Sequence, residues 1–411
     1  MSSSPNAHRP AGLSRKMIGA GVLAGAAIGA VATARARGIT VPREQPTTIA
    51  DWQRAAQIAT GMNRSDALSA AERRQLDIEY RALVEQCLPL VSAYMGISIE
   101  NPVERTFAFD RIDWINANIE AFQNLLGPRN EILLEPGRSQ SLLAATLGTV
   151  NRQVVTAELG MLLGYLARRV LGQYDLALIS GETEGPGNLY FVEPNIRSTE
   201  SMLKLPADEF RLWLALHEIT HVFQFEGFSW VKPYFRSLLD EYFVFLKSDI
   251  GELKNGVRAV RIFVDRLREG QRENQSWIES LMTPEQRSVF NRIQALMSII
   301  EGYSNHVMNA VGKELMPHYD RIAKRFEQRQ KNRGWGEQLL ARMTGLDVKL
   351  EQYRLGETFI DAVVAVRGHE MALRVWDGPE SLPSMAELDE PSRWIARMDA
   401  TLLSAGNVAA R

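Results

Sequence analysis

One stretch decides the fold: Phe210-Arg-Leu-Trp-Leu-Ala-Leu-His-Glu-Ile-Thr-His-Val-Phe-Gln-Phe-Glu-Gly227. Wound as a helix, it is apolar round most of its circumference, so we expect it to be largely buried. Pro206 suits a first helical position, and Asp208 and Glu209 place negative charge at the positive end of the helix dipole. Gly227 is typical of a helix stop. The stretch therefore predicts a buried helix with defined ends.

Two histidines of this stretch, His217 and His221, are four residues apart. On a helix they lie about 40° apart round the axis and about 6 Å apart along it. Two imidazoles on adjacent turns can therefore bind one zinc ion, each at about 2.0–2.1 Å. Glu218 lies beside that face, where a carboxylate can take the proton of a zinc-activated water as the water attacks a carbonyl group. The arrangement is the H-E-x-x-H motif.

The alternative explanation is a buried helix with one polar stripe that faces water. Solvated stripes usually carry Lys, Arg and Glu, whereas this stripe carries two of the six histidines round a carboxylate that is costly to bury without a partner. The residue types therefore favour a metal site. Cys87 is the only cysteine, so disulfides within the chain and cysteine-rich zinc sites are excluded. Any metal must be held by histidine and carboxylate.

The composition indicates a globular protein. The chain has 411 residues, 45% of them hydrophobic and 23% charged, with a net charge of -2, so nothing attracts it generally to nucleic acid. The basic run from Lys324 to Arg333 contains Glu327 and a single aromatic residue, which is typical of a solvated helix end. We predict one domain over residues 46–411 and no nucleic-acid partner.

Residues 1–45 differ from the rest and are predicted to be an N-terminal extension. The uncharged run from Met17 to Thr33 is rich in Gly and Ala and short for a membrane span. A loosely packed or disordered extension is favoured, because Gly and Ala contribute little transfer energy. A weak membrane anchor, a signal segment and a packed helix are the alternatives. We expect a cytoplasmic protein, with membrane contact or export through this run as the alternative.

Helical periodicity dominates from Asp51 onward, so the predicted fold is mainly α with a small β-sheet. Pro89 is expected to kink or end the first long helix. The β signal is confined to Asp175–Ser180 and Asn188–Glu193, which predict a hairpin or two strands of a small sheet. An extended peptide could pair with such a strand, or Leu189, Tyr190 and Phe191 could simply belong to the core. The expected helices cover residues 71–94, 111–126, 141–171, 208–226, 237–249 and 257–279, a long stretch from 284, and a last stretch from about 345 to 366, with packed turns after Trp376.

A catalytic zinc ion takes three protein ligands and keeps one open position. The spacing H-E-x-x-H-x-x-G-x-x-H fails here, because Gln224 and Gly227 stand where Gly and His are required. Glu301 is the best candidate for the third ligand, since it is a carboxylate on an otherwise apolar helix that begins at Thr283. An ion pair with Arg or Lys is the alternative role for Glu301.

Four further polar residues are candidates for supporting roles. His306 is a rival third ligand, but it lies about 140° round the helix from Glu301, which argues against the same ion. Tyr303 or His306 could steady an oxyanion, and Asp240 or Glu241 could orient a zinc-bound histidine. An ordinary polar role is the alternative for all four.

Five motifs occur in order along the chain: Val192-Glu-Pro-Asn-Ile196, Phe210–His221, Glu301-Gly-Tyr-Ser-Asn-His-Val-Met308, Gly345-Leu-Asp-Val-Lys349 and Gln352-Tyr-Arg-Leu-Gly-Glu-Thr-Phe359. Together they resemble one family, the actinobacterial-type zincin-like metallohydrolases associated with deazaflavin-coenzyme biosynthesis. The resemblance implies a zincin-like metalloprotease core and zinc dependence, with His217, His221 and Glu301 as ligands and Glu218 as base. It departs at Tyr303 and Asn305, where members often carry His and an acid. The resemblance runs from about Asp51 to Met398.

Together, the residues and the resemblance predict a zinc-dependent hydrolase of the metallopeptidase class. The expected substrate is a peptide or a small amide, cleaved with Glu218 as general base. The alternative is a catalytically inactive zincin-like binding or scaffold protein, in one version tethered to a membrane through Met17–Thr33. The sequence indicates no oligomeric state.

Overall fold

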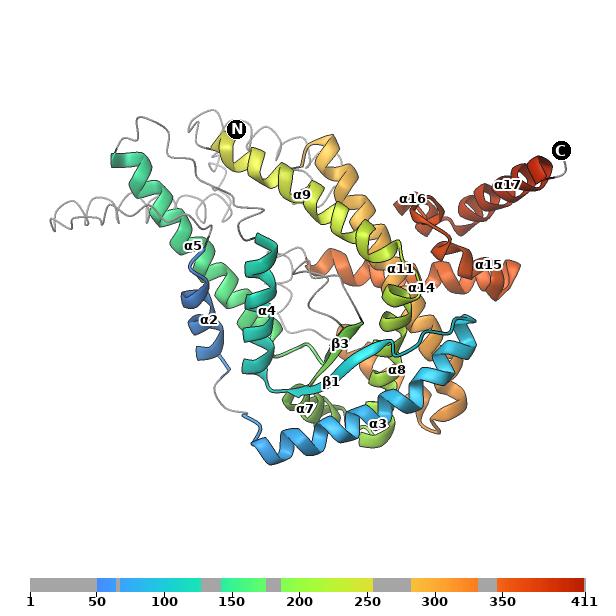
Figure 1. Ribbon diagram of the computed structural model, residues 1–411, viewed down its shortest axis with the longest axis horizontal. Coiled ribbons are helices and arrows are strands. Elements are labelled where there is room, and N and C mark those ends of the chain that lie inside the picture. The colour runs from blue at the N-terminus through green and yellow to red at the C-terminus, as the bar shows by residue number, and fades with distance from the viewer. Residues whose placement is uncertain are drawn as a thin grey trace, which may run out of the picture.

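The structure is a computed structural model that describes residues 50–63, 67–126, 142–174, 186–253, 282–331 and 346–409 (Figure 1). Three predictions lie outside the described residues: the N-terminal extension with Met17–Thr33, the strand at Asp175–Ser180 and the helix at residues 257–279. The single domain over residues 46–411 stays a prediction. In the described part of the chain, no helix has the length and apolar character needed to cross a membrane.

Helices make up most of the described chain, and one small sheet accompanies them, so the predicted fold class is confirmed. The strands are β1 (Val103–Phe109), β2 (Gly172–Tyr174) and β3 (Gly187–Val192). The helices are α2 (Trp52–Gly61), α3 (Ala70–Met95), α4 (Arg111–Leu126), α5 (Leu142–Leu166), α7 (Glu193–Leu203), α8 (Ala207–Glu226), α9 (Val231–Leu253), α11 (Pro284–Leu315), α12 (Tyr319–Lys331), α14 (Leu346–Arg367), α15 (His369–Leu373), α16 (Met385–Asp389) and α17 (Pro391–Ala409).

The described sheet has the order β1-β3-β2, with β1 parallel and β2 antiparallel to β3. The expectation that strands occur only next to the metal-site helix was wrong, because β1 lies far upstream. Its first half carries the exposed charges Glu104 and Arg105, and only Thr106 and Ala108 are buried, so the alternation is short. Its partner β3 is also distant in sequence. A local pattern therefore reveals β1 poorly.

Helix ends follow local capping signals. Ser69 and Glu72 form a capping box at the start of α3, and Thr283 and Gln286 form another at the start of α11. Pro89 lies inside α3 and does not end it, since the helix continues to Met95. Helix α9 begins at Val231, earlier than the predicted residue 237. The prediction of packed turns after Trp376 was wrong for residues 385–389 and 391–409, which form α16 and α17.

The core is centred on α8. Side chains of α3, α8, α11, α14 and the sheet form one buried cluster, and α2, α4 and α5 form a smaller one with Val192 of β3. In Figure 1, α2, α4 and α5 stand together on one side of the sheet, and α15 to α17 lie on the other. Burial of apolar surface on this scale is the main favourable contribution to folding.

Helices α11 and α14 touch through their backbones at two glycines. A Cβ on Gly302 would lie 2.2 Å from the carbonyl carbon of Gly356, and a Cβ on Gly356 would lie 1.8 Å from the carbonyl oxygen of Ser298. Neither distance is tolerated by real side chains, so only glycine fits at both positions. This contact fixes how closely α11 packs against α14 at the helical turn that also carries Glu301.

Candidate metal centre

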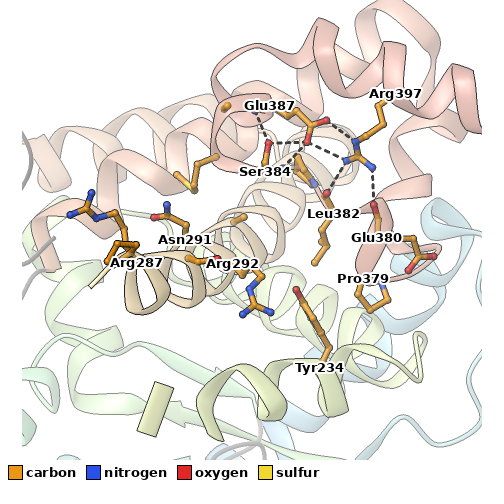
Figure 2. Close-up of a pocket in the computed structure, with 16 residues that line it drawn as sticks. Tyr234, Arg287, Asn291, Arg292, Pro379, Glu380, Leu382, Ser384, Glu387 and Arg397 are labelled. Carbon is orange, nitrogen blue, oxygen red and sulfur yellow. Dashed lines mark hydrogen bonds and ion pairs between the residues drawn. The ribbon is translucent and has the colours of Figure 1, made fainter. Parts of the chain in front are cut away.

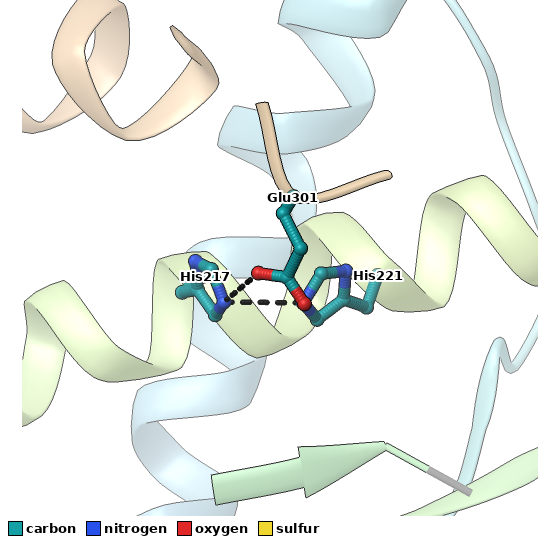
Figure 3. Close-up of side chains that lie close together, drawn as sticks. All are labelled: His217, His221 and Glu301. Carbon is teal, nitrogen blue, oxygen red and sulfur yellow. Dashed lines mark hydrogen bonds and ion pairs between the residues drawn. The ribbon is translucent and has the colours of Figure 1, made fainter. Parts of the chain in front are cut away.

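Helix α8 presents its polar residues from a buried position. Pro206 is the N-cap residue and not the first helical residue, and the Gly227 N–H donates to the Phe223 carbonyl oxygen at 2.9 Å. Most side chains between these ends are buried, as the sequence predicts. His217 and His221 lie one turn apart on the face towards α11 (Figure 3).

Three side chains converge between α8 and α11, as Figure 3 shows. The Nε2 atoms of His217 and His221 are 3.1 Å apart. The Glu301 carboxylate lies between the rings, with Oε2 3.5 Å from Nε2 of His217 and Oε1 3.9 Å from Nε2 of His221. One potential ligand atom from each residue lies within 4.8 Å of the other two. Among the described residues no other group of at least three His, Cys, Asp or Glu meets this condition.

The distances test whether zinc fits this set. Ligand atoms held at about 2.0–2.1 Å in a tetrahedral arrangement are about 3.3 Å from one another. The two shorter contacts, 3.1 Å and 3.5 Å, lie on either side of that value, and the third is longer at 3.9 Å. Two imidazoles with one carboxylate are also a known donor set of catalytic zinc. The residues present therefore fit a zinc ion.

Glu218 lies beside the cluster and is almost fully buried, with 4% of its surface exposed. Within the described chain its carboxylate has no hydrogen-bond partner, and only the charges of His217 and Glu301 act on it. Burial, together with the charge of Glu301, raises the pKa of Glu218 to about 7. A Cβ on Gly172 of β2 would lie 2.4 Å from its Oε1 atom. The glycine thus leaves the space that this carboxylate occupies.

The two histidines differ in their electrostatic environment. Burial lowers the pKa of His221 to about 4, and the charge of His217 adds to this effect. Burial also acts to lower the pKa of His217, but the hydrogen bond and charge of Glu301 outweigh it, so this pKa lies above its usual value. A neutral His221 presents a lone pair, which is the form that binds metal.

The two histidines also differ in the hydrogen-bond partners of their Nδ1 atoms. Nδ1 of His221 lies 2.9 Å from Oε1 of Gln224 and 3.2 Å from Oγ of Ser304. Nδ1 of His217 is buried, and no hydrogen-bond partner for it lies among the described residues. The sequence analysis treated Gln224 only as a departure from a motif and did not consider Ser304. The available signal was the spacing of Gln224, which follows His221 by three residues and so shares its helix face.

Tyr303 and His306 do not join the cluster. His306 binds Asp361 through Nδ1 at 2.6 Å and Tyr94 through Nε2 at 2.8 Å. The Tyr303 hydroxyl lies 3.2 Å from Nε2 of His369. These partners come from α14, α3 and α15, whereas Glu301 faces α8. The part of either side chain in steadying an oxyanion stays a prediction.

Asp240 and Glu241 on α9 are also placed elsewhere. Asp240 pairs with Arg236 at 4.0 Å, and Glu241 pairs with Arg292 at 2.7 Å. All four side chains are at least about one-third exposed, so these are surface ion pairs. The expectation that one of the two acids orients a zinc-bound histidine stays a prediction; the ion pairs described for both acids are with arginines.

A separate pocket of about 800 Å³ lies between the N-terminal half of α11 and the segment from Pro379 to Glu387 (Figure 2). Its described lining does not include His217, Glu218, His221 or Glu301. Two of its cations already have acidic partners, since Arg292 binds Glu241 at 2.7 Å and Arg397 binds Glu387 at 2.7 Å. The pocket therefore lacks the chemistry of the cluster on α8 and α11.

Comparisons with known proteins place this chain beside a family and a solved structure. Residues 50–395 match the family model described as zincin-like metallopeptidase. A crystal structure of a "putative hydrolase with a novel fold" from Chloroflexus aurantiacus is 41% identical in sequence, with a TM-score of 0.63. The match covers 85% of this chain and 99% of that chain. A search of curated proteins finds no match. The family and the solved structure support a hydrolase.

Proposed function

The chain belongs to the zincin-like metallopeptidase family, and on that basis we propose that it is a zinc-dependent hydrolase of peptide or other amide bonds. His217, His221 and Glu301 would hold the ion, and Glu218 would act as the general base. The association with deazaflavin-coenzyme biosynthesis stays a prediction, as do the cytoplasmic location and the absence of a nucleic-acid partner.

One observation carries the proposal. Three ligand-type side chains meet from two helices that lie far apart in sequence, and a buried carboxylate without a hydrogen-bond donor lies beside them. A buried carboxylate of this kind is costly for stability, so a purely structural role does not account for it. Functional sites are the places where such groups collect.

The chemistry divides between the ion and the protein. Zinc, when bound, supplies a Lewis acid that makes water more acidic and polarises a carbonyl oxygen. Glu218 has no donor to compete for its oxygens among the described residues, so it is available to accept a proton from an attacking water. The same carboxyl group can then donate that proton to the leaving amine. Gly172 keeps the space for Glu218 open.

The sheet next to α8 favours an extended substrate. β2 pairs with β3 on one side and stands at an edge in the order β1-β3-β2 of the described strands. Its Gly172 lies against Glu218, so this edge runs close to the proposed base. An extended peptide that adds to such an edge would gain backbone hydrogen bonds next to the metal centre. We therefore propose a peptide or a small amide as the substrate.

The deciding experiment compares purified wild-type protein with Glu218→Gln. Metal analysis should find one zinc per chain in both proteins, because Glu218 is not a ligand. Hydrolysis of a broad peptide library should fall about 10²- to 10⁴-fold in the variant, which is the usual contribution of a general base. Equal cleavage by both proteins would show that the activity does not use Glu218. Wild-type protein with neither zinc nor activity would favour the binding or scaffold alternative.

A further inference from the structure

The ring of His221 is held on the side away from Glu301. Its Nδ1 atom contacts Oε1 of Gln224 at 2.9 Å and Oγ of Ser304 at 3.2 Å. Gln224 is fully buried and follows His221 by about one turn on α8, whereas Ser304 belongs to α11, three residues after Glu301. These contacts join a proposed ligand on one helix to the helix that carries another.

A backbone carbonyl determines how the Gln224 amide is turned. Nε2 of Gln224 donates to the Ile300 carbonyl oxygen at 2.8 Å, and a carbonyl oxygen can only accept. The amide nitrogen must therefore face Ile300, which leaves Oε1, an acceptor, opposite His221. Because an acceptor faces Nδ1 of His221, this nitrogen must carry the hydrogen. The lone pair of the neutral ring is then on Nε2, which faces His217 and Glu301.

Ser304 supports the same assignment. Its hydroxyl group donates to the Ile300 carbonyl oxygen at 2.9 Å, so its oxygen remains an acceptor for Nδ1 of His221. His217 has no counterpart, since its Nδ1 is buried without a hydrogen-bond partner among the described residues. The two proposed ligands are therefore unequal: one ring is oriented in advance, and the other is not.

We propose that Gln224 is a positioning residue of the metal centre, which holds His221 in the Nδ1–H tautomer with Nε2 directed at the ion. The same amide joins α8 to α11 through Ile300, so it also sets the distance between the two histidines and Glu301. This inference rests on the proposed zinc site. A carboxylate or a backbone carbonyl usually plays this part in zinc proteins, and here a buried amide with two fixed partners takes its place.

The test uses the full-length protein with ¹⁵N-labelled histidine, because nitrogen NMR distinguishes the two neutral tautomers. In wild-type protein, metal-free or zinc-loaded, His221 should have a protonated Nδ1 and an unprotonated Nε2. Gln224→Met keeps the length of the side chain but removes both its acceptor and its donor. His221 should then lose its fixed tautomer, and zinc affinity, measured by competition with a chromophoric chelator, should fall about 10- to 100-fold.

Two further variants separate positioning from general stability. Gln224→Glu keeps an acceptor opposite Nδ1 and should retain the tautomer, with a zinc affinity closer to wild type than that of Gln224→Met. Thr220→Val is the matched control, since it removes a different buried polar group of α8, a hydroxyl that donates to the Leu216 carbonyl oxygen at 2.8 Å. It should leave both the tautomer and the zinc affinity unchanged.

The outcomes distinguish this inference from the proposed function. An Nε2–H or mixed tautomer at His221 in wild-type protein would overturn the inference without any variant, even if Gln224→Met does not fold. Unchanged tautomer and affinity in Gln224→Met would also overturn it, while the zinc site would stand. If wild-type protein binds no zinc, the proposed function fails, and the tautomer in the metal-free protein still decides the role of Gln224.

Discussion

Two glutamates of this protein are almost completely buried, and their surroundings are opposite. Glu193 at the start of α7 has 0% exposure and accepts hydrogen bonds from Tyr80 at 2.6 Å, Arg197 at 2.6 Å and Arg211 at 2.8 Å. Glu218 on α8 has 4% exposure and no hydrogen-bond partner within the described residues. Burial alone therefore does not separate a structural carboxylate from a functional one, whereas the set of partners does.

The largest effect is expected from making the same substitution at both positions. Glu193→Gln removes the buried charge that pairs with Arg197 and Arg211 and leaves Arg211 with Glu200 at 2.9 Å, so the free energy of unfolding should fall by about 3–5 kcal/mol. Glu218→Gln removes a buried charge that has no partner and should leave that free energy unchanged or increase it. Urea unfolding of both variants measures the difference. A loss of similar size at Glu218 would mean that it is structural as well, and the contrast would be lost.

Metal removal comes next, because zinc would offset the cost of burying charge in the cluster. Zinc at a thousand times its Kd should raise the free energy of unfolding by about 4 kcal/mol, since it binds only the folded chain. Thermal unfolding with zinc and with a chelator tests this. Glu301→Gln, which removes one proposed ligand, should give a smaller gain. Equal stability with and without zinc in wild-type protein would contradict the metal site.

A smaller effect is expected at Gly172, which makes room for Glu218. In Gly172→Ala the added Cβ would overlap Oε1 of Glu218, which lies 2.4 Å from the ideal Cβ position, so the base must move. Displacement of a catalytic group by about 1 Å can cost about 100-fold in rate, while zinc content should not change. Gly61→Ala is the matched control, because its Cβ would meet nothing within 4 Å. Peptidase assays and metal analysis on both variants decide the point; unaltered activity in Gly172→Ala would remove Gly172 from the site.

The smallest effect is expected for the pH dependence of stability, through His369, whose ring contacts Tyr94 and Tyr303. Burial, helped by the charge of His306, lowers the pKa of His369. The neutral ring is thus favoured in the folded state, so its contribution to stability is complete above the unfolded pKa of about 6.5 and is lost as the pH falls through the folded pKa.

An NMR titration should place His369 below that reference. The fall in unfolding free energy between pH 7.5 and pH 5.5 should be smaller in His369→Phe, which keeps a ring against Tyr94, whose ring centroid lies 4.4 Å from that of His369. A His369 that titrates at or above the reference value would show that the surroundings of this ring do not favour its neutral form.

The parts of the fold that follow from local signals could be predicted from the sequence. Helix α8 follows from its apolar periodicity and α11 from its capping box, and both helices form, although Pro206 is the N-cap residue of α8 and not its first helical residue. Strand β1 could not be found in this way, because it pairs with β3, which is distant in sequence, and only half of it alternates. Helix α7, which begins at Glu193, was also missed, since its Pro194 and Asn195 are typical of turns.

The candidate site also has residues that local sequence signals could identify and residues whose role depends on contacts distant in sequence. The motif singled out His217, Glu218 and His221, and Glu301 was chosen as a carboxylate on an apolar helix; the structure places its carboxylate beside both rings, and its role as a ligand stays a proposal. Gln224 was visible in the sequence, but its meaning depends on the Ile300 carbonyl oxygen, which no spacing reveals.

The close contact between Gly302 and Gly356 links the packing of α11 on α14 to the position of Glu301 in the candidate metal centre. Any side chain at either glycine would act as a wedge that moves α11 away from α14, and Glu301, next to Gly302, would move with it. Substitutions at these glycines, away from the proposed ligands, would therefore change how tightly a zinc ion is held there, without altering any side chain proposed to bind it. A protein engineer seeking a weaker or more selective site would begin at Gly356 and leave the histidines alone.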